Sequence, residues 1–175
     1  MAVEEITIGG EQIKTLAELL RPRLKAVFVG LNPSPVSVEC SHYYQGRHGK
    51  RFWRRLREYN LTPPLPPGQE DESAFEYGYG FADLVRRPSR ASKDLTNAEK
   101  LAGVLDLADR LSRTSDHPLI IFTYAEPWNL AKAHLANKDY RILRMPGPYV
   151  ARKHVKEMMG ELQLALGISD SPTDN

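Results

Sequence analysis

Cysteine and long apolar runs are what this 175-residue sequence has least of. A single cysteine, Cys40, excludes an internal disulfide and any metal or iron–sulfur site made of cysteines alone. No stretch reaches the roughly 20 apolar residues that are needed to cross a bilayer. The N-terminal segment MAVEEITIGG lacks the basic start and the apolar middle of a secretion signal. We therefore expect a cytoplasmic protein with no membrane partner.

A strong net charge is also lacking, since the formal charge is only +2, but the charges are unevenly distributed. The basic residues form three groups, and the acidic residues gather elsewhere. The basic groups are the six Lys and Arg residues from Arg47 to Arg57, then Arg86, Arg87, Arg90 and Lys93, and finally Arg152, Lys153 and Lys156. Such segregation favours a polyanionic partner. The alternative is that these are solvated helix faces that happen to be basic.

The histidines are too scattered to indicate a metal site. None of the five stands at ligand spacing from a carboxylate or from the cysteine. We therefore expect neither a metal nor another cofactor.

The apolar pattern predicts strands that alternate with helices. Strands are expected at 26–31, 119–123 and 141–145, with a short buried segment at 79–85. Helices are expected at 13–20, 97–111, 127–135 and 150–166, and around Phe52 to Tyr59. The inward face of 97–111 is predicted to carry Leu101, Val104, Leu105, Ala108 and Leu111. We expect one domain over 1–167, followed by a disordered tail over 168–175.

Alternating strands and helices predict an α/β fold, with a central, mostly parallel sheet in a three-layer α/β/α arrangement. Ligands of such sheets bind beyond the carboxyl ends of the strands. Two unusual loops follow predicted strands, Asn32-Pro33 and Pro146-Gly147-Pro148. The sequence therefore predicts a binding site at this edge.

Three sequence blocks, in this order, resemble the mismatch-specific uracil/thymine-DNA glycosylases of the uracil-DNA glycosylase superfamily. The resemblance runs from about Ala26 to Glu161, over most of the chain. Its residues are Gly30-Leu31-Asn32-Pro33 with Tyr44 and Phe52-Trp53, then Gly78 to Pro88 followed by Ser92-Lys93-Asp94-Leu95, and finally Met145-Pro146-Gly147-Pro148-Tyr149.

The resemblance implies a monofunctional DNA glycosylase that acts as a monomer on double-stranded DNA, flips uracil out of the helix and hydrolyses its glycosidic bond. G·U mismatches are one expected target, and the protein is expected near the nucleoid. The resemblance implies that Asn32 holds the attacking water and that Ser37 assists. The alternative for Asn32 is that it only caps the turn between strand and loop.

The resemblance also implies a pocket for the flipped base. Tyr44 is the expected stacking platform, with Tyr43 as the alternative. Asp83 is expected to accept a hydrogen bond from N3–H of uracil, unless it caps a helix or pairs with Arg86. The implied pocket residues are Gly30, Leu31, Ser34, Tyr44 and Asp83.

DNA contacts are implied by the basic groups and by the third block. Phosphates are expected to bind near Arg47, Ser92 and Lys93. Tyr149 is the expected wedge in the duplex, although the block could instead be a rigid turn. The implied DNA-binding residues are Arg47, Ser92, Lys93, Gly147, Pro148, Tyr149 and Arg152.

The sequence departs from the family pattern in two places. Ser34-Pro35 stands where the family usually has glycine after Asn-Pro, which narrows the mouth of the pocket and puts thymine in doubt as a substrate. Gly147-Pro148 stands where the family usually has serines that bind phosphate. This difference leaves open which base the protein prefers opposite the lesion. Alternative functions are excision of hypoxanthine or xanthine, and non-catalytic binding to DNA lesions. A nucleoside hydrolase would leave the basic groups unused.

Overall fold

A four-stranded parallel sheet lies at the centre of the computed structural model, which describes residues 3–114, 116–147 and 149–168. The strand order is β4 (Tyr79–Asp83), β3 (Ala26–Gly30), β5 (Leu119–Phe122) and β6 (Ile142–Arg144). All residues of β3, β4 and β5 are buried, as expected for parallel strands covered on both faces. The predicted α/β class and parallel sheet are confirmed.

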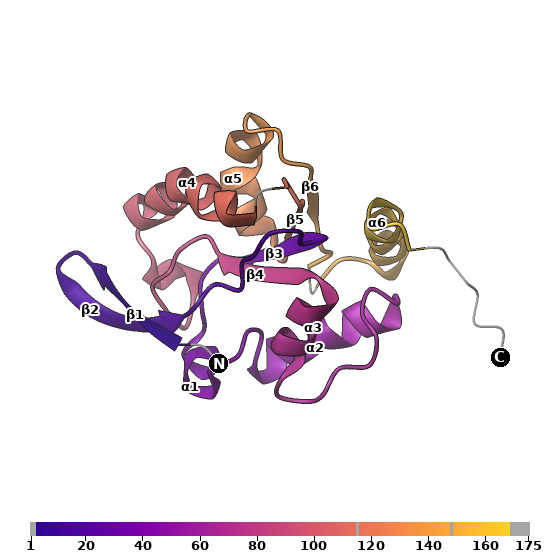
Figure 1. Ribbon diagram of the computed structural model, residues 1–175, viewed down its shortest axis with the longest axis horizontal. Helices are drawn as coiled ribbons and strands as arrows, with labels where there is room; N and C mark the ends of the chain where they lie inside the picture. Colours follow the sequence, from indigo (N-terminus) through magenta and orange to yellow (C-terminus); the bar gives the residue numbers. More distant parts are fainter. Residues whose placement is uncertain (1–2, 115, 148, 169–175) are drawn as a thin grey trace.

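Helices cover both faces of this sheet, so the predicted three-layer arrangement is also confirmed (Figure 1). One face carries α4 (Asn97–Leu111) and α5 (Ala125–Ala136), and the other carries α2 (Gly46–Glu58), α3 (Glu70–Tyr77) and α6 (Arg152–Ala165). Side chains alternate along β3, so Phe28 joins the core under α2 and α6 while Val27 and Val29 join the core under α4.

The bounds predicted for α4 are correct, but part of its predicted inward face is wrong. Leu101 and Leu105 are 62% and 58% exposed, whereas Leu107 is fully buried. Leu107 lies three residues from Val104 and four from Leu111, and Leu105 lies four residues from Leu101 and three from Ala108, so helical spacing alone could not separate the two leucines. Contact with the sheet decides which stripe is buried.

The helix predicted at 13–20 is wrong, because these residues belong to an antiparallel hairpin and the loop after it. The hairpin consists of β1 (Val3–Ile8) and β2 (Glu11–Leu16), with Ile6 opposite Ile13. It extends from the body of the molecule at the left of Figure 1. The Thr15 hydroxyl donates to the Arg86 carbonyl oxygen at 2.6 Å, and this distant contact favours the strand.

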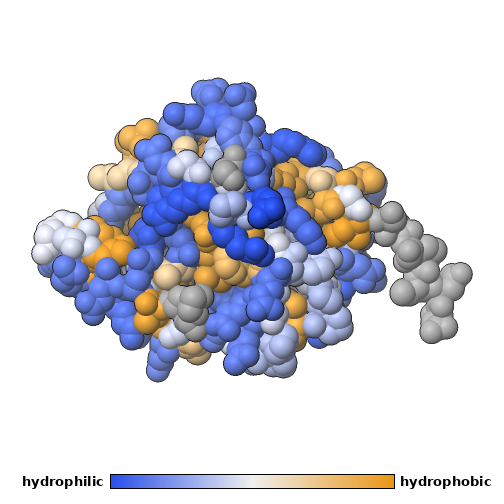
Figure 2. Space-filling view, viewed as in Figure 1, coloured by the Kyte–Doolittle hydropathy of each residue, from blue (hydrophilic) through white to orange (hydrophobic). Residues whose placement is uncertain are grey.

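The remaining elements are short. They are α1 (Pro35–Cys40) and the 3₁₀ turns η1 (Ser92–Asp94) and η2 (Ser112–Thr114). Figure 2 shows a mostly hydrophilic face with hydrophobic residues over the hairpin at the left and over α6 at the right. In the described part of the chain, no helix is both long and apolar enough to span a membrane. The predicted disordered tail falls mostly outside the described residues, which end at 168.

Candidate active site

A cleft of about 560 Å³ opens at the carboxyl edge of the sheet. Its walls come from segments at the carboxyl ends of three strands: residues 30–34 from the end of β3 onward, residues 89–92 in the connection after β4, and residues 124–127 at the start of α5 after β5. The segment from Val36 to Gly49, which includes α1 and the start of α2, supplies the facing wall. The cleft therefore lies where the strand order predicts a ligand.

Asn32 lines this cleft, and its amide nitrogen donates its hydrogen bonds to groups of the protein itself. Nδ2 donates to the Arg87 carbonyl oxygen at 3.0 Å, to Ser89 Oγ at 2.9 Å and to the Pro33 carbonyl oxygen at 3.3 Å. Within the described ranges, no group donates to Oδ1 of Asn32. The side chain therefore braces the loop after β3 and is left with one acceptor.

Ser34 and Ser37 brace the next turn of this wall. Ser34 Oγ caps α1 by accepting from the Ser37 backbone N–H at 3.2 Å, and the two hydroxyls lie 3.0 Å apart. Ser37 Oγ also accepts from the Gln45 N–H at 3.2 Å and is almost fully buried. Both serines line the cleft, but the role predicted for Ser37 beside the water stays a prediction.

Tyr44 is held rigidly in the facing wall. Its ring stacks on Phe52, with centroids 4.0 Å apart, and Trp53 Nε1 donates to its carbonyl oxygen at 3.2 Å. Gly49 allows this packing, because a Cβ there would overlap the Tyr44 carbonyl group. Tyr43 also lines the cleft but is only 3% exposed, so Tyr44 offers the more accessible ring.

A buried carboxylate fixes the loop that carries both tyrosines. Asp71, at the start of α3, accepts from the Tyr43 N–H at 2.8 Å and lies 2.8 Å from His42 Nδ1. His42 therefore has a structural partner. Among the described residues, no group of three or more His, Cys, Asp or Glu side chains is placed to hold a metal ion.

Asp83 ends β4 beside Gly30 of β3, and its buried carboxyl group lines the cleft. Burial raises the pKa of Asp83 to about 7; the charge of Glu18 adds to the rise, and Arg86 and Arg110 oppose it. The predicted alternative, a pair with Arg86, does not form, because Arg86 binds Glu4 and Glu18 instead. Asp83 is thus a buried acid with a proton to exchange near neutral pH.

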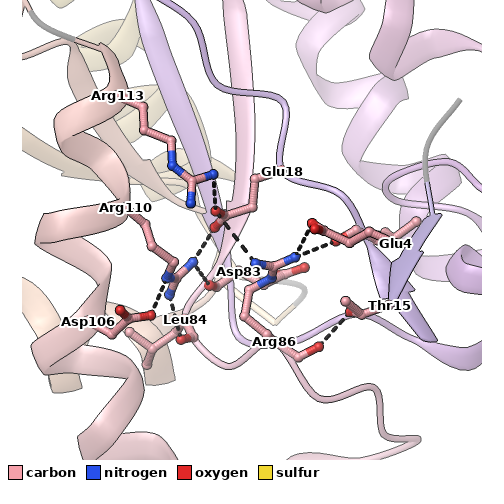
Figure 3. A network of polar contacts seen from close by, with 10 residues as sticks. Glu4, Thr15, Glu18, Asp83, Leu84, Arg86, Asp106, Arg110 and Arg113 are labelled. Atoms are coloured by element: carbon pink, nitrogen blue, oxygen red, sulfur yellow. Dashed lines mark hydrogen bonds and ion pairs between the residues drawn. The ribbon is translucent and has the colours of Figure 1, made fainter. Parts of the chain in front are cut away.

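The charges behind Asp83 form a network centred on buried Glu18 (Figure 3). Three arginines converge on its carboxylate: Arg110, Arg86 at 3.7 Å and Arg113 at 3.6 Å. Arg86 reaches Glu4 at 2.6 Å and so ties the hairpin to this network.

Part of the basic group from Arg86 to Lys93 therefore faces inward, contrary to the prediction. Arg86 is bound within the network, and Arg87 pairs with Glu99 and donates to the Asp94 carbonyl oxygen. Arg90 lines the cleft and Lys93 is exposed, so these two remain as surface charges. A partner that binds this loop meets fewer charges than the sequence indicates.

The other predicted DNA-binding residues lie around the cleft. Arg47 is exposed and belongs both to the cleft and to an open groove along α2 that four further bases line, namely Lys50, Arg51, Arg54 and Arg57. Tyr149 lines the cleft and is 98% exposed. Gly147 lines a small pocket beside α2, Arg152 begins α6, and Pro148 lies outside the described residues.

The junction between β5 and α5 carries cleft residues that the sequence did not identify. Tyr124 and Glu126 line the cleft, and Lys100 of α4 reaches Glu126 at 2.8 Å. Ser92, predicted to bind phosphate, donates to both carboxylate oxygens of Glu126, at 2.7 and 2.6 Å. The available signal was position, because Tyr124-Ala125-Glu126 directly follows the strand predicted at 119–123 and so belongs to the same edge of the sheet.

Replacement of Gly30 by alanine is expected to destabilise the protein by about 1–3 kcal/mol, because a new Cβ would overlap the Asp83 carboxyl group. Urea denaturation measures this loss. Gly160→Ala is the matched control, since no atom lies within 4 Å of its Cβ position, and it should leave stability unchanged or higher. Equal stability of the Gly30 variant and the wild type would show that Asp83 does not pack there.

Two comparisons relate the chain to known proteins. A family model described as the uracil DNA glycosylase superfamily matches residues 17–159. Among solved structures, the chain is similar to the solution NMR structure of a protein from Methanosarcina acetivorans, provisionally described as a uracil DNA glycosylase. The two are 14% identical, with a TM-score of 0.59, over 86% of this chain and 96% of that one. This likeness supports the fold, and the family match begins only after the hairpin.

Proposed function

The chain belongs to the uracil DNA glycosylase superfamily, and from this membership and the cleft we propose that it excises uracil from double-stranded DNA, in particular from G·U mismatches. Membership supports DNA N-glycosylase activity. The finer assignment, to a monofunctional and mismatch-specific enzyme that works as a monomer, is part of the proposal. The observation that carries it is the cleft, where Asn32, Tyr44 and Asp83 meet from separate segments.

Asn32 is proposed to hold the water that attacks the sugar. The water oxygen bonds to C1′ while the bond from C1′ to the base breaks, and the electron pair leaves with the base as an anion. The proton that the water loses passes to the solvent or to the departing base. With Nδ2 bound to the protein, Oδ1 is the atom of Asn32 that accepts from this water. An amide orients water without deprotonating it, so a slow enzyme is expected.

Tyr44 and Asp83 are proposed to hold the flipped base. Stacking on an aromatic ring contributes about 1–3 kcal/mol per base and tolerates any base. Asp83 supplies selectivity: its carboxyl oxygen accepts from N3–H of uracil, and in the protonated form its O–H donates to the adjacent carbonyl oxygen. The backbone N–H groups near Leu31 and Ser34 are the proposed donors to the departing anion.

The rim of the cleft is proposed to bind the DNA strand. Arg47, Lys93 and Arg152 are exposed bases that attract phosphates. Tyr149, almost fully exposed beside the cleft, is the proposed wedge that fills the gap left by the flipped nucleotide.

A second candidate substrate is a deaminated purine, hypoxanthine or xanthine. The cleft volume of about 560 Å³ leaves room for a purine, and these bases carry the same N–H and carbonyl pair that Asp83 would recognise. In this case the residues keep their roles and only the base differs.

A panel of labelled duplexes tests the proposal. Each duplex carries one uracil, thymine, hypoxanthine or xanthine, and the base opposite this lesion is varied between duplexes. Each duplex is incubated with the protein and analysed with and without alkali. We expect strand breaks only after alkali, with uracil opposite guanine processed fastest. Breaks before alkali would contradict a monofunctional mechanism. No breaks with any lesion would leave a non-catalytic DNA-binding protein.

A further inference from the structure

Ser92, Lys100 and Glu126 form a closed polar cluster on the rim of the cleft. The Ser92 hydroxyl donates to the Glu126 carboxylate at 2.6 Å. Lys100 Nζ donates to Glu126 at 2.8 Å and to Ser92 Oγ at 3.0 Å. The three side chains come from the loop after β4, from α4 and from the first turn of α5. A hydroxyl and an ammonium group thus converge on one anion.

The carboxyl group of Glu126 in this cluster is ionised and partly exposed to solvent. Burial alone raises the pKa of Glu126, but hydrogen bonds from Lys100 and Ser92 outweigh it, and the pKa is lowered. The Glu126 side chain is 40% exposed and that of Lys100 only 12%. The donors are therefore fixed in the wall, while the carboxylate has a path outward.

We propose that Ser92 and Lys100 form a binding site for a DNA backbone phosphate, and that the Glu126 carboxylate occupies this site in the free protein. The inference rests on the proposed function, because a strand in the cleft brings its phosphates to this rim. Carboxylate and phosphate oxygens accept from the same hydroxyl and ammonium donors. The two anions repel each other, so a phosphate enters only as Glu126 leaves.

This exchange lets Glu126 limit how tightly the protein holds DNA. When a phosphate displaces it, Lys100 keeps one anionic partner, and Glu126 turns to solvent through its exposed side. The cost of breaking the ion pair between Lys100 and Glu126 thus offsets part of the favourable free energy of the phosphate contact. The expected consequence is a lower affinity for DNA and faster release of the product.

Fluorescence anisotropy with an undamaged 20-base-pair duplex tests the exchange. Glu126→Gln should bind about 3- to 10-fold more tightly than the wild type, because it removes the charge that repels phosphate and replaces the ion pair with Lys100 by a weaker neutral hydrogen bond. Asp109→Asn is the control: it removes one exposed carboxylate from α4, outside the cleft, and should change affinity less than about twofold. Ser92→Ala in the Glu126→Gln background should lose part of the gain.

Salt dependence separates the exchange from a general effect of charge. The slope of log affinity against log salt should steepen in Glu126→Gln, by at most about 0.9, because in the wild type Glu126 still holds Lys100 in a fraction of the complexes, whereas in the variant Lys100 neutralises the phosphate in all of them. Equal or weaker binding with an unchanged slope, in both Glu126→Gln and Glu126→Ala, would overturn the inference and leave Glu126 as a tie between loop and helix. If the variants bind tighter but neither they nor the wild type release uracil, the phosphate site stands and the glycosylase proposal fails.

Discussion

Replacement of Asn32 by alanine is expected to slow base release by about 10²–10⁴-fold, the range for loss of a group that positions or activates the attacking water. DNA affinity should change less than about threefold, because phosphate contacts dominate binding. The expected loss follows from Oδ1, the one acceptor that the amide retains for a water molecule. Single-turnover base release, with anisotropy on the same duplex, measures both quantities.

Asn32→Asp separates orientation from basicity. A carboxylate is the stronger base, but it would place an oxygen where Nδ2 now donates to the Arg87 carbonyl oxygen at 3.0 Å. The two acceptors repel, so the side chain should turn and this variant should also be slower than the wild type. Ser89→Ala removes one of the acceptors that hold the amide and should have a smaller effect. A faster Asn32→Asp enzyme would contradict the proposed anchoring.

The second large effect is a loss of activity with rising pH that depends on Asp83. The rate of base release should fall about tenfold per pH unit above a pKa of about 7, because only the protonated acid donates to the base as well as accepting from it. The charged groups that face Asp83 are Glu18, Arg86 and Arg110. The tyrosines around it are neutral in this range, since burial raises the pKa of Tyr43, Tyr44 and Tyr124.

Asp83→Asn should abolish this pH dependence and keep activity. An amide has one acceptor and one donor in the places where the neutral acid has them, so the variant mimics the protonated form at every pH. At pH 9, about two units above the pKa of Asp83 in the wild type, it should exceed the wild type by about 100-fold. An inactive Asp83→Asn protein across the pH range would instead mean that the ionised carboxylate is needed.

The pH dependence of the free energy of unfolding provides an independent measure of the protonation of Asp83. The pKa of Asp83 is raised in the folded state from 3.8 to about 7, so its ionisation destabilises the fold as pH rises between these values. At about 1.4 kcal/mol per pKa unit, the full effect is at most about 4 kcal/mol. Asp83→Asn should therefore be more stable than the wild type by about 1–3 kcal/mol at pH 8 and equally stable near pH 4, as measured by urea denaturation.

The sheet and the position of the cleft could be predicted because both depend on local patterns. Apolar runs such as Ala26 to Val29 need no distant contact to be recognised as buried strands, and parallel strands bring their carboxyl ends to one edge. Asn32, Tyr44 and Asp83 could be named as cleft residues for this reason and from the family resemblance. Their chemical roles remain predictions.

The features that could not be predicted depend on contacts between distant residues. Segment 11–16 has apolar residues compatible with both a helix and a strand, and its strand is supported by the contact between Thr15 and the Arg86 carbonyl. Arg87 lies in a basic stretch, yet Glu99 of the next helix neutralises it. Glu126 lies 34 residues from Ser92 in the sequence, and no local pattern predicts the hydrogen bond between them.

The most direct test of the account is a mass balance on the reaction products. A duplex with one uracil opposite guanine is incubated with excess wild-type protein, and free uracil and abasic sites are quantified by chromatography and mass spectrometry. We expect free uracil and intact abasic strands in equal amounts, with neither product from a cytosine control duplex. Bound duplex without free uracil, or strand scission in place of an intact abasic site, would contradict the account.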